Sequence, residues 1–174
     1  MKAPRSHGPI LVVFLDVDGV LNSIETFTAR ERARKEGPVD TDEGHQIDRG
    51  LVARLNTLLE LTGAKVVVSS TWRMGRTTAE LQKLLESRGF RGEVIGVTPI
   101  HYNEGRERGH EIQEWLERSR THVHSFVILD DDSDMAHLRH RLVQTTVQTG
   151  LQDHHISMAT TILRRLVRQR RPVR

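Results

Sequence analysis

Residues 10–22 read ILVVFLDVDGVLN, an apolar run that ends in two aspartates and a glycine. The run from 10 to 15 shows no polar alternation, which is typical of a strand buried on both faces of a parallel sheet. Asp16 and Asp18 lie two residues apart, so their side chains face the same way if the strand continues. Close carboxylates repel each other and favour a divalent cation between them. Gly19 allows a sharp turn after the strand.

Four more strands are predicted outward from this stretch, at 65–69, 93–97, 126–129 and 142–146. Helices are predicted between them: one capped by Asp48 and stopped by Gly63, one from Thr77 or Thr78 to before Gly89, and two over 109–118 and 157–167. This alternation predicts an α/β fold, a three-layer Rossmann-like open parallel sheet with helices on both faces. We expect one domain over 1–174, with the polar segment 22–47 as a flap or short helical insertion.

The second strand ends in Ser69-Ser70-Thr71-Trp72-Arg73. Hydroxyls at a strand end can donate to phosphate oxygens, and Arg73 adds a planar, permanently charged fork for the same anion. Trp72 is interpreted as a packed side chain, with stacking on a base or sugar as the alternative. In open α/β sheets ligands bind at the carboxyl ends of strands, which is where these residues lie.

The third strand end reads ILDDDSDM over 128–135, with four acids in five positions. Such a cluster repels itself without a counter-ion, and Mg²⁺ accepts carboxylate oxygens while keeping several waters. The alternative is an acidic surface turn in which Ser133 or Asp134 caps the next helix. The pattern as a whole predicts a magnesium site.

Together these motifs resemble the haloacid dehalogenase (HAD) superfamily. The resemblance rests on the strand followed by Asp16-x-Asp18-Gly19, on Ser70 after a second strand, on a basic residue before a helix, and on the acids after a third strand. It spans nearly the whole chain in the right order. More narrowly, residues 15–22, 69–73, 108–116 and 128–135 look like the small group of such domains found with RNA-repair enzymes.

The resemblance implies a role for each matching residue. Asp16 attacks phosphorus and becomes an aspartyl phosphate, and Asp18 protonates the leaving oxygen and then activates water. Ser70, or alternatively Ser69, holds a phosphate oxygen. Arg108 neutralises the charge of the nucleophile and the phosphoryl group. Arg106 is the alternative for this role, but Arg108 is preferred because it directly precedes the predicted helix.

The implied magnesium ligands are Asp16, the Asp18 carbonyl and Asp130, with Asp131 or Asp134 binding directly or through water. We further expect substrate contacts from four residues near the same edge: Gly19, Asn22, Thr71 and Arg73.

The predicted function is therefore a Mg²⁺-dependent phosphomonoester hydrolase acting on nucleic-acid ends, with a 3'-phosphate of RNA or DNA as the substrate. The domain works either alone or beside a kinase or ligase partner, and the sequence leaves both open. Two alternatives stay open: a phosphatase of a small metabolite such as a nucleotide or sugar phosphate, and a non-catalytic nucleic-acid-binding module.

Composition sets the wider limits. The chain has no cysteine, which excludes disulfides and thiolate chemistry. The net charge of +3 comes from residues 164–174, because without their six arginines 20 basic residues face 23 acidic ones. That basic tail is expected either to bind a polyanion or to be a solvated end.

No signal peptide or membrane span is apparent, so a cytoplasmic location is expected. The ten histidines lack the spacing of a structural zinc site and are expected mostly on the surface.

Overall fold

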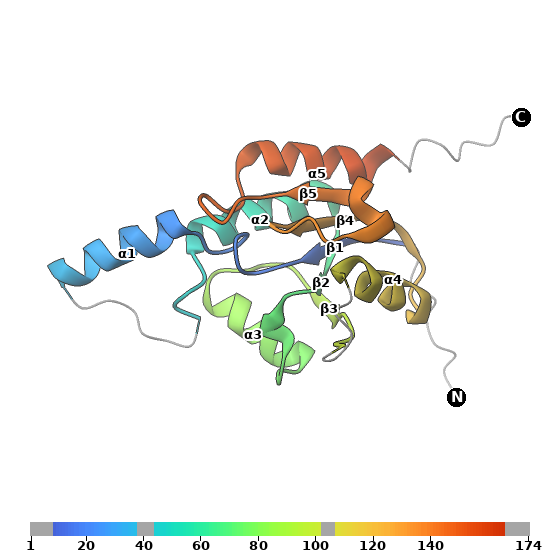
Figure 1. The fold of residues 1–174 in the computed structure, drawn as a ribbon, viewed down its shortest axis with the longest axis horizontal. Helices are drawn as coiled ribbons and strands as arrows, with labels where there is room; N and C mark the ends of the chain where they lie inside the picture. Colours follow the sequence, from blue (N-terminus) through green and yellow to red (C-terminus); the bar gives the residue numbers. More distant parts are fainter. Residues whose placement is uncertain (1–8, 38–43, 102–106, 166–174) are drawn as a thin grey trace, which may run out of the picture.

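The computed structural model describes residues 9–37, 44–101 and 107–165. Its core is one sheet with strand order β3-β2-β1-β4-β5, in which every neighbouring pair is parallel (Figure 1). The strands are β1 (Ile10–Leu15), β2 (Lys65–Val68), β3 (Val94–Val97), β4 (Val123–Asp130) and β5 (Leu142–Gln144). All five overlap the predicted ranges, although β4 begins three residues earlier than expected. The predicted α/β fold with an open parallel sheet is confirmed.

The strand order fixes where a site can form. From the central β1 the chain proceeds to β2 and β3 on one side, and then returns to place β4 on the other side of β1. The direction of winding therefore reverses between β1 and β4. At such a reversal the connections leave the sheet in opposite directions, and a crevice opens at the carboxyl ends of the two strands.

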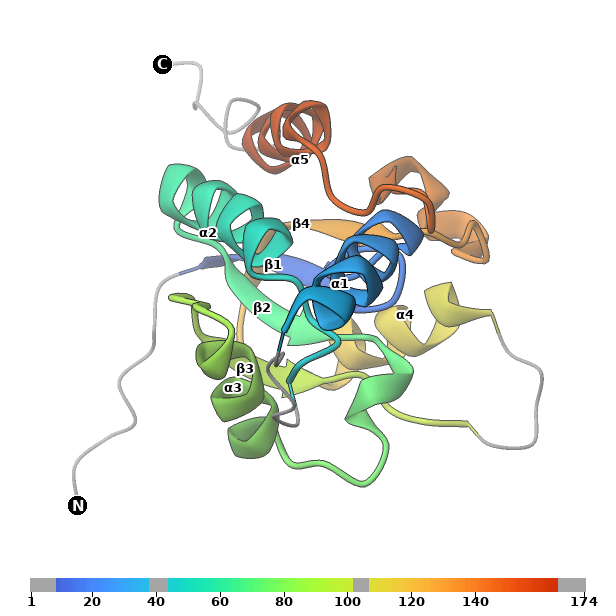
Figure 2. The same ribbon diagram turned by 90° about the vertical axis from the view of Figure 1, so that its left-hand side faces the viewer.

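Helices cover both faces of this sheet. Val13 and Leu15 of β1 point into the larger apolar cluster, which includes residues of α2, α3 and α5, whereas Val12 and Phe14 point into a second cluster with α4 and η2. Figure 2 shows α2 and α3 on the opposite side of the sheet from α4. The bounds are α2 (Arg49–Thr62), α3 (Thr78–Ser87), α4 (Arg108–Arg118), the short 3₁₀ helix η2 (Ala136–Arg141) and α5 (Asp153–Arg165).

The predicted helix caps lie where the sequence placed them. The Leu51 N–H donates to the Asp48 carboxylate at 2.9 Å and starts α2. Gly63 ends that helix in the left-handed region, with φ +68°, and its N–H donates to a carbonyl of the last turn. Thr77 caps α3 through a capping box.

The predicted start of the last helix is wrong. The structure begins α5 at Asp153, four residues before the expected position 157. The helix starts earlier because its buried face begins earlier, and this face consists of His155, Ile156, Ala159 and Leu163. A buried histidine in this face was not expected, since the histidines were predicted to lie mostly on the surface. His155 is only 5% exposed. The expected end of this helix at 167 lies outside the described residues, as do the tail arginines beyond 165.

The polar segment after β1 contains α1 (Ile24–Glu36), a helix that projects from the body of the molecule (Figure 1). A capping box between Ser23 and Thr26 starts it. Two large apolar side chains at its base, Ile24 and Phe27, are exposed. The helical alternative for residues 22–47 thus holds for 24–36, whereas 38–43 are not described.

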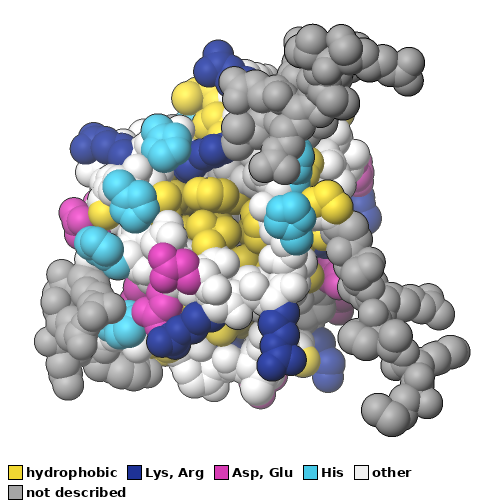
Figure 3. Space-filling view, turned by 90° about the vertical axis from the view of Figure 1, so that its right-hand side faces the viewer, with side chains coloured by type: hydrophobic (Ala, Val, Ile, Leu, Met, Phe, Trp, Pro, Cys, Tyr) yellow, Lys and Arg dark blue, Asp and Glu magenta, His cyan; other side chains and the backbone are white. Residues whose placement is uncertain are grey.

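The side of the molecule opposite α1 carries hydrophobic side chains in its centre and histidines spread around them (Figure 3). Over residues 9–37, 44–101 and 107–165, potential metal-ligating side chains gather in one place, formed by aspartates without any histidine. Within those same ranges no helix is both long and apolar enough to cross a bilayer.

Candidate active site

Asp16 and Asp130 stand side by side at the reversal point of the sheet. Leu15 pairs with Leu129 across β1 and β4, and the Asp16 N–H donates to the Leu129 carbonyl oxygen at 3.0 Å. Both carboxylates are buried, with exposed fractions of 5% for Asp16 and 0% for Asp130. The parallel register alone therefore brings together two acids that are far apart in the sequence.

Asp131 completes a group of three acids. One carboxylate oxygen from each of Asp16, Asp130 and Asp131 lies within 4.8 Å of the other two. The Oδ2 atom of Asp130 is buried and, within the described part of the chain, has an ion pair but no hydrogen-bond partner. Hard carboxylate oxygens at this spacing, one of them lacking a donor, fit a divalent cation such as Mg²⁺.

Burial raises the pKa of all three carboxyl groups. For Asp16 it outweighs the opposing effects of the Arg108 charge and a hydrogen bond from Ser70. Burial raises the pKa of Asp130 to about 7, again against the attraction of Arg108. For Asp131 burial acts first and the nearby Asp16 charge second. Three anions at this place thus need added positive charge or a proton.

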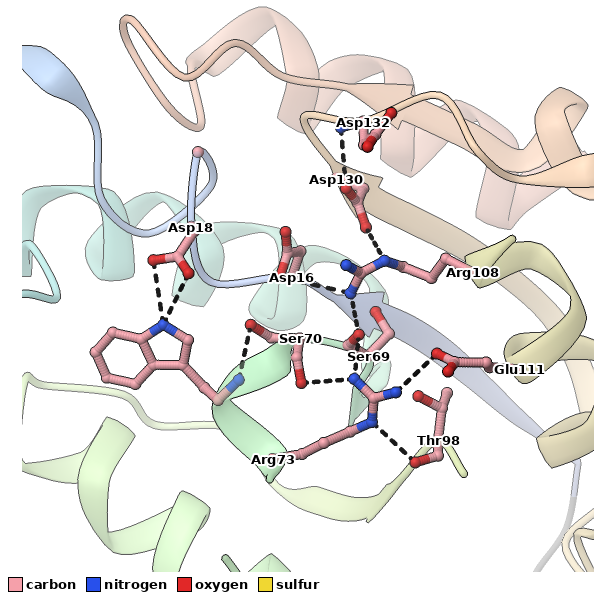
Figure 4. A network of polar contacts seen from close by, with 12 residues as sticks. Asp16, Asp18, Ser69, Ser70, Arg73, Thr98, Arg108, Glu111, Asp130 and Asp132 are labelled. Carbon is pink, nitrogen blue, oxygen red and sulfur yellow. Dashed lines mark hydrogen bonds and ion pairs between the residues drawn. The ribbon is translucent and has the colours of Figure 1, made fainter. Parts of the chain in front are cut away.

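Arg108 supplies part of that positive charge from the first turn of α4 (Figure 4). Its Nε lies 3.1 Å from Oδ2 of Asp130, and its Nη1 lies 3.7 Å from Oδ1 of Asp16. Nη1 also donates to the Ser69 carbonyl oxygen. Burial works against this cation, but the carboxylates of Asp130 and Asp16 raise the pKa of its guanidinium above the ordinary value.

The two serines at the end of β2 differ in what their hydroxyls face. The Ser70 hydroxyl hydrogen-bonds to Asp16 and also accepts from the Trp72 N–H at 3.3 Å. The Ser69 hydroxyl is buried without a partner among the described residues. Of the two serines considered, Ser70 is therefore the one that the structure places at the acid cluster. Arg106, the alternative to Arg108, lies outside the described residues.

Asp18 does not join the acid cluster. Its exposed carboxylate points toward the indole of Trp72, whose Nε1 donates to both oxygens at 3.1 and 3.0 Å (Figure 4). Asn22 donates a further hydrogen bond to Oδ1 at 2.7 Å. The side chain of Asp18 is thus no ligand of the cluster, which is compatible with the expected use of its carbonyl.

The expected substrate contacts of Asn22 and Gly19 are not supported. Asn22 is buried, and its side chain closes the loop by accepting from the Gly19 N–H at 3.0 Å and donating to Asp18. The Gly19 carbonyl accepts from the Thr145 hydroxyl at 2.7 Å. Gly19 adopts φ +69°, and a Cβ there would collide with the Asp131 carboxylate. Both residues shape the loop because their polar groups are already used within it.

The expected substrate contact of Arg73 is not supported, for the same kind of reason. Its guanidinium is buried, with 4% of the residue exposed, and its donors are consumed inside the protein (Figure 4). They reach the carbonyl oxygens of Ser69, Ser70, Thr98 and Pro99 and the carboxylate of Glu111, at 2.7 to 3.0 Å. Arg73 instead ties the end of β2 to β3 and α4. Thr71 is exposed next to it and stays a predicted substrate contact.

Asp134 lies outside the group of three acids, so its binding to a metal, directly or through water, stays a prediction. Its Oδ2 accepts from the Arg108 N–H at 3.1 Å and so caps α4, whose own N-cap residue, Glu107, makes no side-chain cap. The alternative left open from the sequence, in which Ser133 or Asp134 caps the next helix, is wrong: η2 has no side-chain cap, and the helix that Asp134 caps comes earlier in the chain. Of Asp131 and Asp134, the structure brings Asp131 to the cluster.

Two contacts of this site were missed from the sequence. Trp72 packs against the larger core cluster, as interpreted, but it also donates to Asp18 across 54 positions of sequence. Glu111 pairs with Arg73 at 2.7 Å from within α4. Neither contact has a local sequence signal, because each joins residues from different elements.

Residues 12–156 match the family described as "HAD domain in Swiss Army Knife RNA repair proteins". Among solved structures, the HAD domain of effector protein Lem4 from Legionella pneumophila is similar, with a TM-score of 0.48 and 14% identity over 92% of this chain and 97% of that chain. An inactive mutant of the same domain gives a TM-score of 0.48 and 12% identity over the same shares. No curated protein matches the chain.

Proposed function

The chain belongs to the family of HAD domains in Swiss Army Knife RNA repair proteins, and we propose that it is a Mg²⁺-dependent phosphomonoester hydrolase acting on nucleic-acid ends. The observation that carries the proposal is the meeting of Asp16, Asp130 and Asp131 within 4.8 Å, beside Arg108, at the reversal point of the sheet. A buried group of acids next to one arginine is a site for an anion that arrives together with a cation.

In the first step Asp16 attacks phosphorus and the bond to the leaving oxygen breaks. That oxygen takes the proton of Asp18, and the phosphoryl group remains on Asp16 as an acyl phosphate. Arg108, 3.7 Å from the Asp16 carboxylate, helps to keep the nucleophile ionised and offsets the charge of the phosphoryl oxygens. The Ser70 hydroxyl, which faces Asp16, is placed to donate to one of those oxygens.

In the second step a water molecule gives its proton to Asp18 while its oxygen attacks the same phosphorus. The bond between phosphorus and Asp16 breaks, inorganic phosphate leaves, and the two aspartates return to their starting protonation states.

Asp16, Asp130 and Asp131 would hold Mg²⁺, together with the Asp18 carbonyl. When bound, the ion supplies charge neutralisation for the phosphoryl group and for the attacking carboxylate.

Three observations support a nucleic-acid end as the substrate. The family is described by its occurrence in RNA repair proteins. The last eleven residues carry six arginines and no acid, a composition that suits a polyanion. Asp18 is also exposed, so that a bulky leaving group has access to it.

The test is phosphate release with Mg²⁺ from RNA and DNA oligonucleotides bearing a 3'-phosphate, beside 5'-phosphorylated oligonucleotides, nucleoside monophosphates and 4-nitrophenyl phosphate. Wild type is expected to cleave the 3'-phosphorylated oligonucleotides with the highest kcat/KM. Asp16→Asn is expected to lose at least about a thousandfold, because it keeps the shape and removes the attacking charge.

Asp153→Asn is the matched control, because Asp153 is 92% exposed in its side chain and lies in the first turn of α5, outside the acid cluster. If nucleoside monophosphates are the better substrates, the small-metabolite alternative replaces the nucleic-acid one. Tight oligonucleotide binding without turnover of any ester would reject the enzyme and favour the binding module.

A further inference from the structure

The indole of Trp72 and the carboxylate of Asp18 form a contact that the scheme above does not use. Nε1 of Trp72 lies 3.1 Å from Oδ1 and 3.0 Å from Oδ2 of Asp18, so a single N–H is shared between both oxygens. The Asn22 amide adds a donor to Oδ1 at 2.7 Å. Asp18 is exposed, and these two neighbours are what hold its carboxylate in place.

Trp72 is itself firmly held. It belongs to the 3₁₀ turn η1 (Thr71–Arg73), and its backbone N–H donates to the Ser70 hydroxyl oxygen at 3.3 Å. The ring packs against the larger core cluster, and the Arg76 guanidinium lies 5.9 Å from its centroid. The turn that presents Ser70 to Asp16 thus also presents a fixed N–H to Asp18.

We propose that Trp72 is the positioning residue for Asp18 in proton transfer, an inference that rests on the proposed phosphatase function. A general acid must sit within hydrogen-bond reach of the leaving oxygen, and small displacements of a reacting group cost large factors in rate. Without Trp72 the exposed Asp18 carboxylate would keep only the Asn22 donor on Oδ1, so it would visit more orientations and point at that oxygen for less of the time.

The contacts also indicate which of the two carboxylate oxygens of Asp18 transfers the proton to the leaving group. An ionised carboxylate offers about four acceptor positions. Trp72 and Asn22 occupy two on Oδ1, and Trp72 occupies one on Oδ2, so among the residues that the structure describes the open position is on Oδ2. Oδ2 of Asp18 is therefore the oxygen that gives its proton to the leaving group and later takes one from water.

An indole suits this role because its N–H donates and cannot accept. It holds Asp18 whether the carboxyl is charged or carries a proton on Oδ2, and it offers no competing site for the proton. The transfer therefore stays between Asp18 and the substrate.

The experiment compares kcat/KM for a 3'-phosphorylated oligonucleotide, whose leaving group is an alkoxide, with kcat/KM for 4-nitrophenyl phosphate, whose leaving group needs little protonation. This constant reports steps up to phosphoryl transfer, so the later attack of water does not enter it. Trp72→Phe removes the N–H and keeps an aromatic ring. We expect a loss of about tenfold to a hundredfold for the oligonucleotide, part of the usual contribution of a general acid, and about threefold or less for the nitrophenyl ester.

Trp115→Phe is the matched control, because Trp115 is the other tryptophan of the chain and packs on the opposite face against Phe14. It should leave the ratio of the two kcat/KM values unchanged. Asp18→Asn should show the same selective loss as Trp72→Phe, only larger, and the double variant Asp18→Asn/Trp72→Phe should lose nothing beyond Asp18→Asn.

Equal losses on both substrates would overturn the inference, because they would assign Trp72 to packing alone, and so would unchanged kcat/KM on both. If Trp72→Phe does not fold, 3-benzothienylalanine at position 72 keeps the shape of indole and replaces the N–H by sulfur, with the same outcomes expected. Wild type that cleaves neither ester would instead reject the phosphatase, and the inference with it.

Discussion

Nε of Arg108 lies 3.1 Å from Oδ2 of Asp130. Arg108 is the first residue of α4, and Asp130 is the last residue of β4. Asp130 has no exposed surface, and this cation is its ion-pair partner. Burial still outweighs the pairing and raises the pKa of Asp130 to about 7 from its ordinary value of 3.8. One arginine is therefore too little charge for the acids that meet here.

A pH-dependent response to Mg²⁺ is the first expected consequence. Between about pH 4 and pH 7 the folded protein holds a proton on Asp130 that the unfolded chain has released, so without metal the free energy of unfolding falls as pH rises through this window. Mg²⁺ should raise the unfolding temperature more at pH 8 than at pH 5, where it competes with that proton.

Scanning calorimetry with and without Mg²⁺ checks this expectation, and Asp130→Asn is the comparison. That variant should reduce both the pH dependence and the gain from Mg²⁺, since Asp130 contributes to both alongside Asp16 and Asp131. An equal Mg²⁺ gain at the two pH values would contradict the assignment of Asp130 as a ligand.

The contact between Gly19 and Asp131 gives a second prediction. Gly19→Ala and Gly63→Ala place the same methyl group at nearly the same backbone angle, φ +69° and +68°. Both should cost about 1–2 kcal/mol for a left-handed alanine. Gly63 has open space around it, whereas a Cβ at Gly19 meets the Asp131 carboxylate.

The two alanine variants should therefore differ in metal affinity. Mg²⁺ titration of phosphatase activity should give a weakened affinity for Gly19→Ala, because Asp131 must move, and a wild-type affinity for Gly63→Ala. The same Mg²⁺ affinity in both variants would show that Asp131 does not bind the ion.

Replacing Arg73 is expected to lower the free energy of unfolding by a large amount. Arg73→Ala leaves the half-buried Glu111 carboxylate without this cation and removes the side-chain donor from the Thr98 and Pro99 carbonyl oxygens, which should cost about 3–5 kcal/mol in urea denaturation. Arg91→Ala breaks an exposed ion pair with Glu60 and should cost less than about 1 kcal/mol. Comparable losses would mean that the Arg73 network adds little to folding.

The arginine-rich end predicts a substrate-dependent effect. Deleting residues 166–174 removes four arginines. If they bind phosphates, KM for a phosphorylated oligonucleotide should rise at low salt, and its salt dependence should flatten by about 0.7 log units for each phosphate that is no longer neutralised. KM for 4-nitrophenyl phosphate should stay the same. A deletion that leaves oligonucleotide KM and its salt slope unchanged assigns the tail no role in binding.

Sequence patterns predicted the frame of the site because that frame is local. An apolar run with β-branched residues forms a buried strand wherever it lies, and acids directly after it reach the carboxyl edge of a parallel sheet. That is sufficient to place Asp16 and Asp130 at one edge. It also explains why the caps at Asp48 and Gly63 were found, since each depends on a few neighbouring residues.

The predictions that the structure does not support concern polar side chains whose partners come from other parts of the chain. From the sequence, Arg73 is predicted to bind an anion. In the structure its guanidinium instead donates to a carbonyl oxygen after β3 and to Glu111 of α4. Asn22 was likewise predicted to contact substrate, but its side-chain amide oxygen accepts a hydrogen bond from the Gly19 N–H of the same loop. A sequence gives the number of donors on a side chain, but burial decides whether protein or ligand uses them.

The sequence by itself determined the strands, the order of the acids and the basic residue before α4, because these follow from apolar periodicity and from chemistry carried by single residues. Only the tertiary structure decided which acids share a site, with Asp131 inside and Asp134 as a helix cap, and that Asp18 faces Trp72. The physical reason is that strand pairing and loop packing set distances of a few ångströms between residues far apart in the chain, and hydrogen bonds and ion pairs form only within such distances.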